Sequence, residues 1–243
     1  MKIDIVIPYS SKDDYTIKSC INSLSKLKER GNVFIISKED PNVQTNIEYS
    51  WINEDDFHFT KESIINANNI VPEKRSGWYF QQFLKLYCCA QEQISDTFLV
   101  LDSDVIFLKE VSFVKDGKLA YNYSSEYTPD YFNCMSKLNS YFERSVTKSG
   151  ICHHMIFEKK ILDEIFSLIQ TSNEEIYETI MKAVDNWHHG FSEYELYFHY
   201  IFKKYPKEYA LRYLRYADVD DYKIGSYSDY DYIANHEWKR NSK

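Results

Sequence analysis

Two aspartates separated by one residue are the part of this sequence best suited to do chemistry. Asp102 and Asp104 follow the apolar run 97–101 directly, and a second apolar run, 105–108, comes after them. Ligands of open α/β sheets bind beyond the carboxyl ends of the strands. Because residues two apart in an extended chain point to the same side, the two carboxylates should converge there. A divalent cation would relieve their mutual repulsion, and hard oxygen ligands suit Mg²⁺ or Mn²⁺.

The alternative for this pair is a solvated turn whose aspartates cap nearby backbone groups. A surface turn is rarely bracketed by apolar runs on both sides, which favours a buried strand that runs into a ligand site. A metal bound there can bridge a diphosphate and stabilise it as a leaving group. The pair therefore predicts metal-dependent chemistry on a diphosphate, with Mn²⁺ or Mg²⁺ as the cofactor.

Alternating strands and helices are expected to position the two aspartates. Residues 3–8 form an apolar run typical of a buried strand, 13–29 carry apolar residues at helical spacing, and 32–37 form a second strand. This β-α-β order predicts a parallel sheet with a right-handed crossover, and a short strand is expected near 47–53. The remaining strands are expected at 97–101, 119–123 and 154–158, and the remaining helices at 77–93, 129–146, 159–170, 173–186 and 193–204. The acidic, aromatic segment 218–232 is expected to be a loop.

Composition limits the class of protein. The chain has 243 residues, which suits one α/β domain with a modest C-terminal elaboration. Its net charge of −8 argues against a nucleic-acid-binding protein, which needs a basic face. No G-x-G-x-x-G or P-loop sequence occurs, so neither kind of nucleotide site is expected. Five cysteines without C-x-x-C spacing indicate reduced thiols, and neither a signal peptide nor a transmembrane run of ~20 apolar residues is evident, which predicts a cytoplasmic location.

Four ordered blocks resemble a known family. "FLVLDSDVIFL" (98–108) resembles the D-x-D segment of GT-A glycosyltransferases. Together with "GWYFQQFLKLY" (77–87), "SGICHHMIF" (149–157) and "FSEYELYFHY" (191–200), it resembles the DUF6492 family of GT-A-like proteins. The resemblance implies an α/β, GT-A (Rossmann-like) nucleotide-diphospho-sugar transferase fold, with a mostly parallel central sheet flanked by helices. It also implies a nucleotide-sugar donor and a hydroxyl acceptor.

Carried over residue by residue, the resemblance implies a donor site formed by Pro8, Tyr9, Ser10, Gln82, Lys85, Asp102 and Ser103. Asp104 would coordinate the metal, and Asp102 would meet the ribose, the metal or a metal-bound water. His236 is a candidate third ligand, because several GT-A enzymes complete the metal shell with a C-terminal histidine. The alternative for His236 is a surface residue in a tail. Lys85 would meet a phosphate or orient an aspartate, unless its ammonium reaches solvent.

The last block carries the candidate general base. Ser192 followed by Glu195 is a capping box, which gives Glu195 a structural role at a helix start, and Glu195 is also kept among the catalytic candidates. Many inverting GT-A enzymes place a catalytic acid in an E-D-x-E-L segment at a helix start. Laying S-E-Y-E-L on that pattern puts Glu193 at the base position, with Ser192 as a departure from it. Acceptor binding and a structural role are the alternatives for Glu193.

Histidine pairs at 153–154 and 188–189 suggest zinc, but the pattern is incomplete. Adjacent residues of a strand face opposite sides, and no cysteine or carboxylate completes a zinc-site spacing. His154 is instead predicted to line the acceptor pocket and to take part in catalysis, with a satisfied buried histidine as the alternative.

These residues predict one catalytic domain over 1–217 and a C-terminal loop or tail over 218–243 that closes over the donor site. The expected reaction is metal-dependent transfer of a sugar from a nucleotide diphosphate, with UDP as the expected nucleotide, to a hydroxyl of a glycan. The alternative from another class is a non-catalytic GT-A-like scaffold that binds glycan or protein. A sugar-phosphate nucleotidyltransferase fits less well, because segment 9–14 lacks the glycine-rich, basic character of those enzymes.

Overall fold

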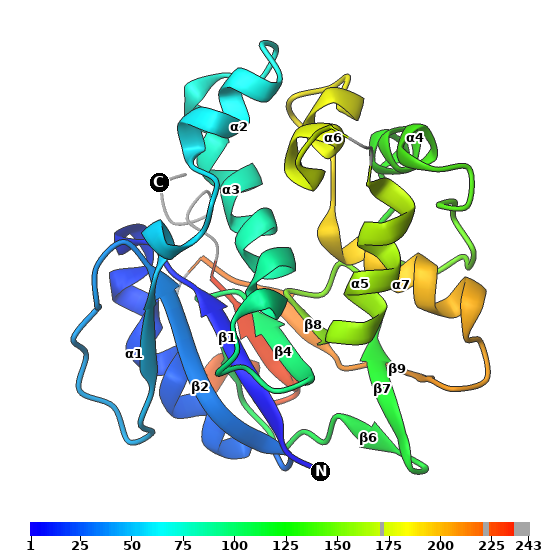
Figure 1. Cartoon of the computed structure of the whole chain (residues 1–243). Helices are drawn as coiled ribbons and strands as arrows, with labels where there is room; N and C mark the ends of the chain where they lie inside the picture. Colours follow the sequence, from blue (N-terminus) through cyan, green and yellow to red (C-terminus); the bar gives the residue numbers. More distant parts are fainter. Residues whose placement is uncertain (171–172, 221–223, 236–243) are drawn as a thin grey trace.

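The computed structural model describes residues 1–170, 173–220 and 224–235. A five-stranded sheet in the order β3-β2-β1-β4-β8 forms its centre (Figure 1). Its strands are β1 (Ile3–Pro8), β2 (Arg30–Ser37), β3 (Ser50–Asn53), β4 (Thr97–Leu101) and β8 (His154–Glu158). Strands β1 to β4 run parallel, and β8 lies antiparallel to β4. The predicted α/β class with a mostly parallel central sheet is therefore confirmed.

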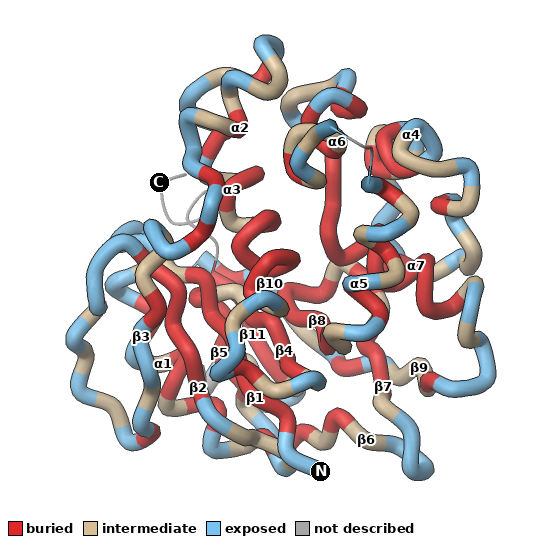
Figure 2. Tube along the Cα trace, viewed as in Figure 1, coloured by how far each residue is buried: buried red, intermediate tan, exposed pale blue. Residues whose placement is uncertain are grey.

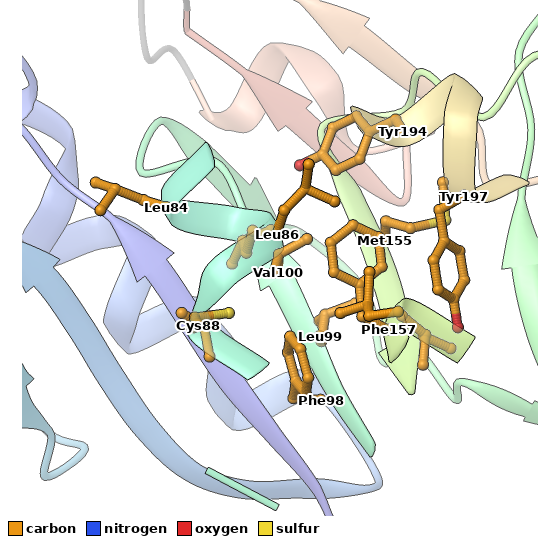
Figure 3. Packing of buried hydrophobic residues seen from close by; sticks show 14 of the residues in the cluster. Leu84, Leu86, Cys88, Phe98, Leu99, Val100, Met155, Phe157, Tyr194 and Tyr197 are labelled. Atoms are coloured by element: carbon orange, nitrogen blue, oxygen red, sulfur yellow. The ribbon is translucent and has the colours of Figure 1, made fainter. Parts of the chain in front are cut away.

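Burial explains why these segments are strands. All six residues of β1 and the last four of β4 are buried, as expected for parallel strands covered on both faces. Helix α3 (Glu73–Tyr87) packs on the sheet, and its Leu86 lies beside Val100 of β4, in the same core cluster as Met155 of β8 (Figure 3). Figure 2 shows this buried centre surrounded by exposed loops. The core thus holds the carboxyl end of β4 in a fixed place.

The remaining elements complete two smaller sheets and the helical layers. The other helices are α1 (Asp14–Ser23), α2 (Lys61–Ala67), α4 (Pro129–Leu138), α5 (Lys159–Ile169), α6 (Ile176–Ala183) and α7 (Glu193–Lys204). The other strands are β5 (Val105–Phe107), β6 (Val114–Lys115), β7 (Lys118–Asn122), β9 (Ala210–Arg212), β10 (Tyr216–Asp218) and β11 (Tyr232–Ala234). Among the described residues, none of the helices has both the length and the apolarity needed to cross a bilayer.

The helices expected at 13–29, 77–93, 129–146 and 173–186 all differ from their predicted bounds, and local chemistry explains two of these differences. The helix expected at 77–93 begins earlier, directly after Pro72, whose fixed φ suits the residue before a helix. The helix expected at 129–146 ends at Leu138. Asn139 is extended there, and its side-chain amide donates to a backbone carbonyl of α5 at 3.0 Å. Apolar spacing does not reveal such caps, so it misplaces helix ends.

Part of the C-terminal segment is built into a sheet. β10 pairs parallel with β11, and β11 pairs antiparallel with β5. The loop expected over 218–232 is therefore wrong at both ends, where the two strands lie, and β10 crosses the expected boundary after residue 217. β5 follows Asp104 directly, so this small sheet fixes the chain immediately after the two aspartates.

Candidate active site

The two aspartates lie in a turn at the carboxyl end of β4. The backbone N–H of Asp102 donates to the carbonyl of His153 at 3.0 Å, and the N–H of Val105 donates to the carbonyl of Asp102 at 3.2 Å. The N–H of Asn235 donates to the carbonyl of Asp104 at 3.0 Å. The extended geometry assumed from the sequence is therefore wrong for this pair, because residues 102–105 turn. The turn is held instead by the start of β8 and by the residue after β11.

A buried ammonium joins two carboxylates beside this turn. Lys85 Nζ lies 2.6 Å from Asp102 Oδ1 and 2.9 Å from Glu193 Oε1, and its side chain is 4% exposed. The same ammonium lies 4.4 Å from the centre of the Tyr194 ring, and the Tyr194 hydroxyl lies 3.4 Å from Asp102. We call these four residues the Lys85 cluster. Of the roles expected for Lys85, the structure shows that it orients an aspartate, and a solvent-reaching ammonium is wrong.

The Lys85 cluster shifts the ionisation of its members. Burial alone would raise the pKa of Asp102, but the Lys85 ammonium and the neighbouring His153 ring hold it well below its usual range. Burial raises the pKa of Glu193, and Lys85 only partly opposes this. Burial would lower the pKa of Lys85, but Asp102 and Glu193 raise it well above its ordinary value. The site therefore holds a charged Asp102 beside a glutamate that is more basic than an exposed one.

Gln82 lies one turn before Lys85 on α3 and faces the same helix start. Its Oε1 accepts a hydrogen bond from the backbone N–H of Glu193 at 3.1 Å. This bond satisfies one of the N–H groups that the first turn of α7 leaves without an intrahelical acceptor. Gln82 was expected to contact the donor, and in the structure its carbonyl oxygen fixes the position of Glu193.

Glu195 faces away from the Lys85 cluster. The Ser192 hydroxyl accepts from the Glu195 N–H at 3.3 Å, so the predicted N-cap is confirmed. The Glu195 carboxylate, however, accepts from the Ser149 hydroxyl at 2.7 Å and from the Gly150 N–H at 3.1 Å, where a capping box would return it to Ser192. The carboxylate is fully buried and holds the loop before β8. We therefore leave Glu195 out of the proposed reaction.

His154 lies in an aromatic enclosure inside the fold. Its ring packs within 5.1–5.8 Å of the rings of Phe107, Phe113 and Tyr232, and its side chain is 3% exposed. Neither ring nitrogen has a hydrogen-bond partner among the described residues. Burial lowers the pKa of His154 to about 3, so the ring is neutral. The ring is buried as the alternative expected, but it lacks the hydrogen-bond partners of a satisfied histidine, and we do not assign His154 to an acceptor pocket.

The residues expected to hold the nucleotide lie at the end of the neighbouring strand. Pro8 ends β1, and the N–H of Tyr9 donates to the carbonyl of Ile36 on β2 at 2.8 Å. Next to them, the Ser103 hydroxyl donates to a carboxylate oxygen of Asp13 at 2.7 Å. Ser10 accepts from the N–H of Asp13 at 2.8 Å. The structure thus brings the segment after β1 and the aspartate turn together at adjacent strand ends.

Family comparison identifies the chain. It matches the family described as "Family of unknown function (DUF6492)" over residues 1–220. The chain belongs to the DUF6492 family. A comparison of this DUF6492 chain with curated proteins gave no significant match.

The DUF6492 chain also resembles a solved glycosyltransferase structure. Mouse xyloside xylosyltransferase 1 in its apo form aligns with a TM-score of 0.52 at 8% sequence identity. The alignment covers 97% of the DUF6492 chain and 98% of the mouse chain. At this identity the likeness shows the fold alone. It confirms the GT-A glycosyltransferase fold that the four sequence blocks imply.

Charge at the site of the DUF6492 chain suits a cation. Burial raises the pKa of the Cys20 thiol most, and the charges of Asp104, Asp102 and Asp13 raise it further, so three carboxylates lie near one buried point. The Lys85 ammonium lies beside this group and forms ion pairs with Asp102 and with a second carboxylate. The carboxylates of this group are hard oxygen donors of the kind that divalent cations prefer.

The protein ligands of such a metal are incomplete within the described residues. Over residues 1–170, 173–220 and 224–235, no group of three His, Cys, Asp or Glu side chains is arranged to hold a metal ion. The third ligand expected from the sequence, His236, lies outside the described residues. It follows Asn235, whose backbone N–H is bonded to the carbonyl of Asp104.

Sequence reasoning missed His153. Its Nδ1 lies 3.8 Å from Asp102 Oδ2, and its Nε2 lies 3.1 Å from Asp218 Oδ1 of β10. Its backbone φ is 63°, in the left-handed region that costs a histidine energy and that clusters at functional sites. No spacing pattern signals this residue, because it depends on Asp218 coming from a distant segment.

Proposed function

We propose that this DUF6492 protein is a metal-dependent glycosyltransferase that moves a sugar from a nucleotide-diphosphate donor, with UDP as the first nucleotide to test, to a hydroxyl of a glycan acceptor. The Lys85 cluster carries the proposal. It places a charged Asp102 and a basic Glu193 around one ammonium at the carboxyl end of β4, where α/β sheets bind ligands. The fold shared with a xylosyltransferase supports the same reaction class.

The donor half of the site would use Asp102 and Asp104. Mn²⁺ or Mg²⁺, when bound, supplies the positive charge that a departing nucleoside diphosphate needs. Asp102 and Asp104 would hold the ion, with His236 as the proposed third protein ligand and diphosphate oxygens as further ones. Asp13, through Ser103, would set the position of the aspartate turn, and Pro8, Tyr9 and Ser10 would border the nucleotide.

The acceptor half would use Glu193 as the general base. As the bond between the anomeric carbon and the diphosphate oxygen breaks, the acceptor oxygen bonds to that carbon and passes its proton to Glu193. Burial favours this role because it raises the pKa of Glu193, and Gln82 fixes the backbone that carries it. Attack from the side opposite the leaving group would invert the anomeric configuration, so a retained configuration in the product would remove Glu193 from this role.

Calorimetry with nucleotides tests the proposal directly. UDP, GDP, CDP and dTDP would be titrated with and without Mn²⁺ into the wild type, Asp104→Asn and the control Asp185→Asn, whose carboxylate is 74% exposed just after α6. We expect one nucleotide to bind only with Mn²⁺, binding to disappear in Asp104→Asn and the control to match the wild type. A folded wild type that binds no nucleotide would contradict the proposal and favour the scaffold alternative.

A further inference from the structure

A cavity of about 360 Å³ opens between the end of β7 and the start of β10. Three tyrosines, Tyr123, Tyr213 and Tyr216, form its aromatic walls, and Lys148 and Glu126 supply its charged groups. Its volume lies near the lower end of the range for small-ligand pockets, about 300–1,000 Å³. A second hollow, between residues 67–70 at and after the end of α2 and residues 182–185 at and after the end of α6, includes none of the candidate site residues.

The tyrosine cavity adjoins the Lys85 cluster through two rings. Tyr216 meets the His153 ring edge to face, with ring centres 5.3 Å apart. His153 in turn lies 3.8 Å from Asp102. Tyr216 is held from behind by Tyr232, on which it stacks at 5.0 Å. A molecule in the cavity would therefore lie on the β7 and β10 side of Asp102, whereas Tyr9 and Ser10 lie on the β1 side.

The chemistry of the cavity walls suits a sugar ring. Tyr213 is 57% exposed and offers an aromatic face, and Tyr123 packs against it with ring centres 5.6 Å apart while the Lys148 ammonium lies 4.7 Å from the Tyr123 ring centre. The C–H faces of a pyranose pack on such rings, and its hydroxyls need both donors and acceptors. Lys148 and Glu126 provide one group of each kind. An acyl chain would need unbroken apolar walls, and a polyanion would need more than one positive charge.

We propose that this cavity is the acceptor subsite and binds a pyranose ring of a glycan. The inference rests on the proposed function, which places the donor on the opposite side of Asp102. It places the acceptor sugar of that reaction in this cavity, with Tyr213 as the stacking residue and Tyr123 as its support.

Hydrogen bonds that begin at the Glu195 carboxylate hold one wall of this cavity in place. Ser124, which lines the cavity, pairs through its backbone with Ser149 at 2.9 and 3.2 Å. The Ser149 hydroxyl and the Gly150 N–H both donate to the Glu195 carboxylate. Glu195 is thus a positioning residue for the part of the cavity wall that contains Ser124. This role accounts for a buried carboxylate that does not take part in helix capping.

Saturation-transfer NMR with simple glycosides tests the subsite. The probes are methyl glucopyranoside, galactopyranoside, mannopyranoside, xylopyranoside and N-acetylglucosaminide, each titrated against the wild type, Tyr213→Ala and Tyr127→Ala. Tyr127 is a matched control, since it is 55% exposed, does not line the cavity and packs against Arg144. We expect at least one glycoside to bind, with affinity about tenfold weaker in Tyr213→Ala and unchanged in Tyr127→Ala.

Nucleotide calorimetry on the same samples separates this inference from the proposed function. If UDP binds with Mn²⁺ but no glycoside binds, or if both tyrosine variants weaken binding equally, the subsite is wrong and the donor site stands. If a glycoside binds through Tyr213 but no nucleotide binds, the subsite stands as a glycan site and the transferase proposal is wrong. Melting curves of both variants confirm that each is folded, which an exposed position such as Tyr213 should allow.

Discussion

Two glutamates in the first turn of α7 are both buried and two residues apart, yet their surroundings differ in kind. Glu193 faces Lys85 and shares that ammonium with Asp102 at the end of β4. Glu195 faces hydroxyl and amide donors of the loop before β8 and lies 3.2 Å from His199 Nε2. The Glu193 carboxylate thus belongs to a charged network in which two carboxylates share one ammonium. The Glu195 carboxylate accepts hydrogen bonds from the loop before β8. Burial of an acidic residue therefore does not mark a reactive group, and its partners decide the role.

The largest expected difference between the two glutamates is in reaction rate. Glu193→Gln keeps the shape and an oxygen for Lys85 but removes the proton acceptor, so nucleoside diphosphate release during transfer should slow by about 10²–10⁴-fold. Mn²⁺-dependent nucleotide binding, followed by calorimetry, should persist. Glu195→Gln is the matched control and should retain the rate per folded molecule at saturating acceptor. Equal loss of rate in Glu193→Gln and Glu195→Gln would contradict the assignment of the general base to Glu193 alone.

The next largest effect is on stability, and here Glu195 should dominate. Glu195→Ala leaves the Ser149 hydroxyl and the Gly150 N–H buried without their acceptor, so the free energy of unfolding should fall by about 3 kcal/mol. Urea denaturation at neutral pH measures this loss. Glu143→Ala removes a 63% exposed carboxylate paired with Lys203 and should change stability by no more than about 0.5 kcal/mol. If Glu195→Ala matched Glu143→Ala, the carboxylate would have no bracing role.

The smallest effect concerns His154, which is buried and whose ring nitrogens have no hydrogen-bond partner in the described part of the chain. It shows how a buried ionisable group behaves without the partners that the two glutamates have. Burial lowers its pKa from 6.5 to about 3, so the unfolded chain takes up a proton at a higher pH than the folded one. Its stabilising contribution is full above pH 6.5 and is lost as pH falls toward the folded value.

The free energy of unfolding of the wild type should therefore fall by about 1 kcal/mol more than that of His154→Phe when the pH is lowered from about 6.5 to 5.5. Urea denaturation at the two pH values measures the difference. An equal pH dependence in wild type and His154→Phe would mean that the histidine is protonated or solvated in the fold.

Strong local patterns predicted the parts of the fold and site that depend on neighbouring residues. The apolar run of β4 ends in a carboxylate pair, and this alone placed Asp102 and Asp104 at a strand end. Ser192 and the residue three positions later revealed the start of α7. The parallel order of the sheet followed from the first strand, helix and strand. Each of these features arises from residues that are close together in the chain.

Features that depend on distant residues could not be predicted in the same way. Lys85 and Glu193 are 108 positions apart, so nothing in their spacing shows that they pair. The turn at Asp102 depends on a carbonyl of His153, and the left-handed φ of that histidine has no sequence signal. The hydrogen bonds of the Glu195 carboxylate depend on the loop at Ser149, which is also distant in the chain. Lys85, Glu193 and Glu195 could be recognised as candidates from the sequence, but their interaction partners depend on the tertiary structure.

The pairing of β5 with β11 has a consequence for the order of events during synthesis. Val105 emerges from the ribosome long before Ala234, its partner across that ladder. Until then β5 has an open edge, and contacts between segments so far apart form slowly. The sheet that holds the aspartate turn can close only after β11 has been made, so in a nascent chain this turn becomes fixed late, once β11 can pair with β5.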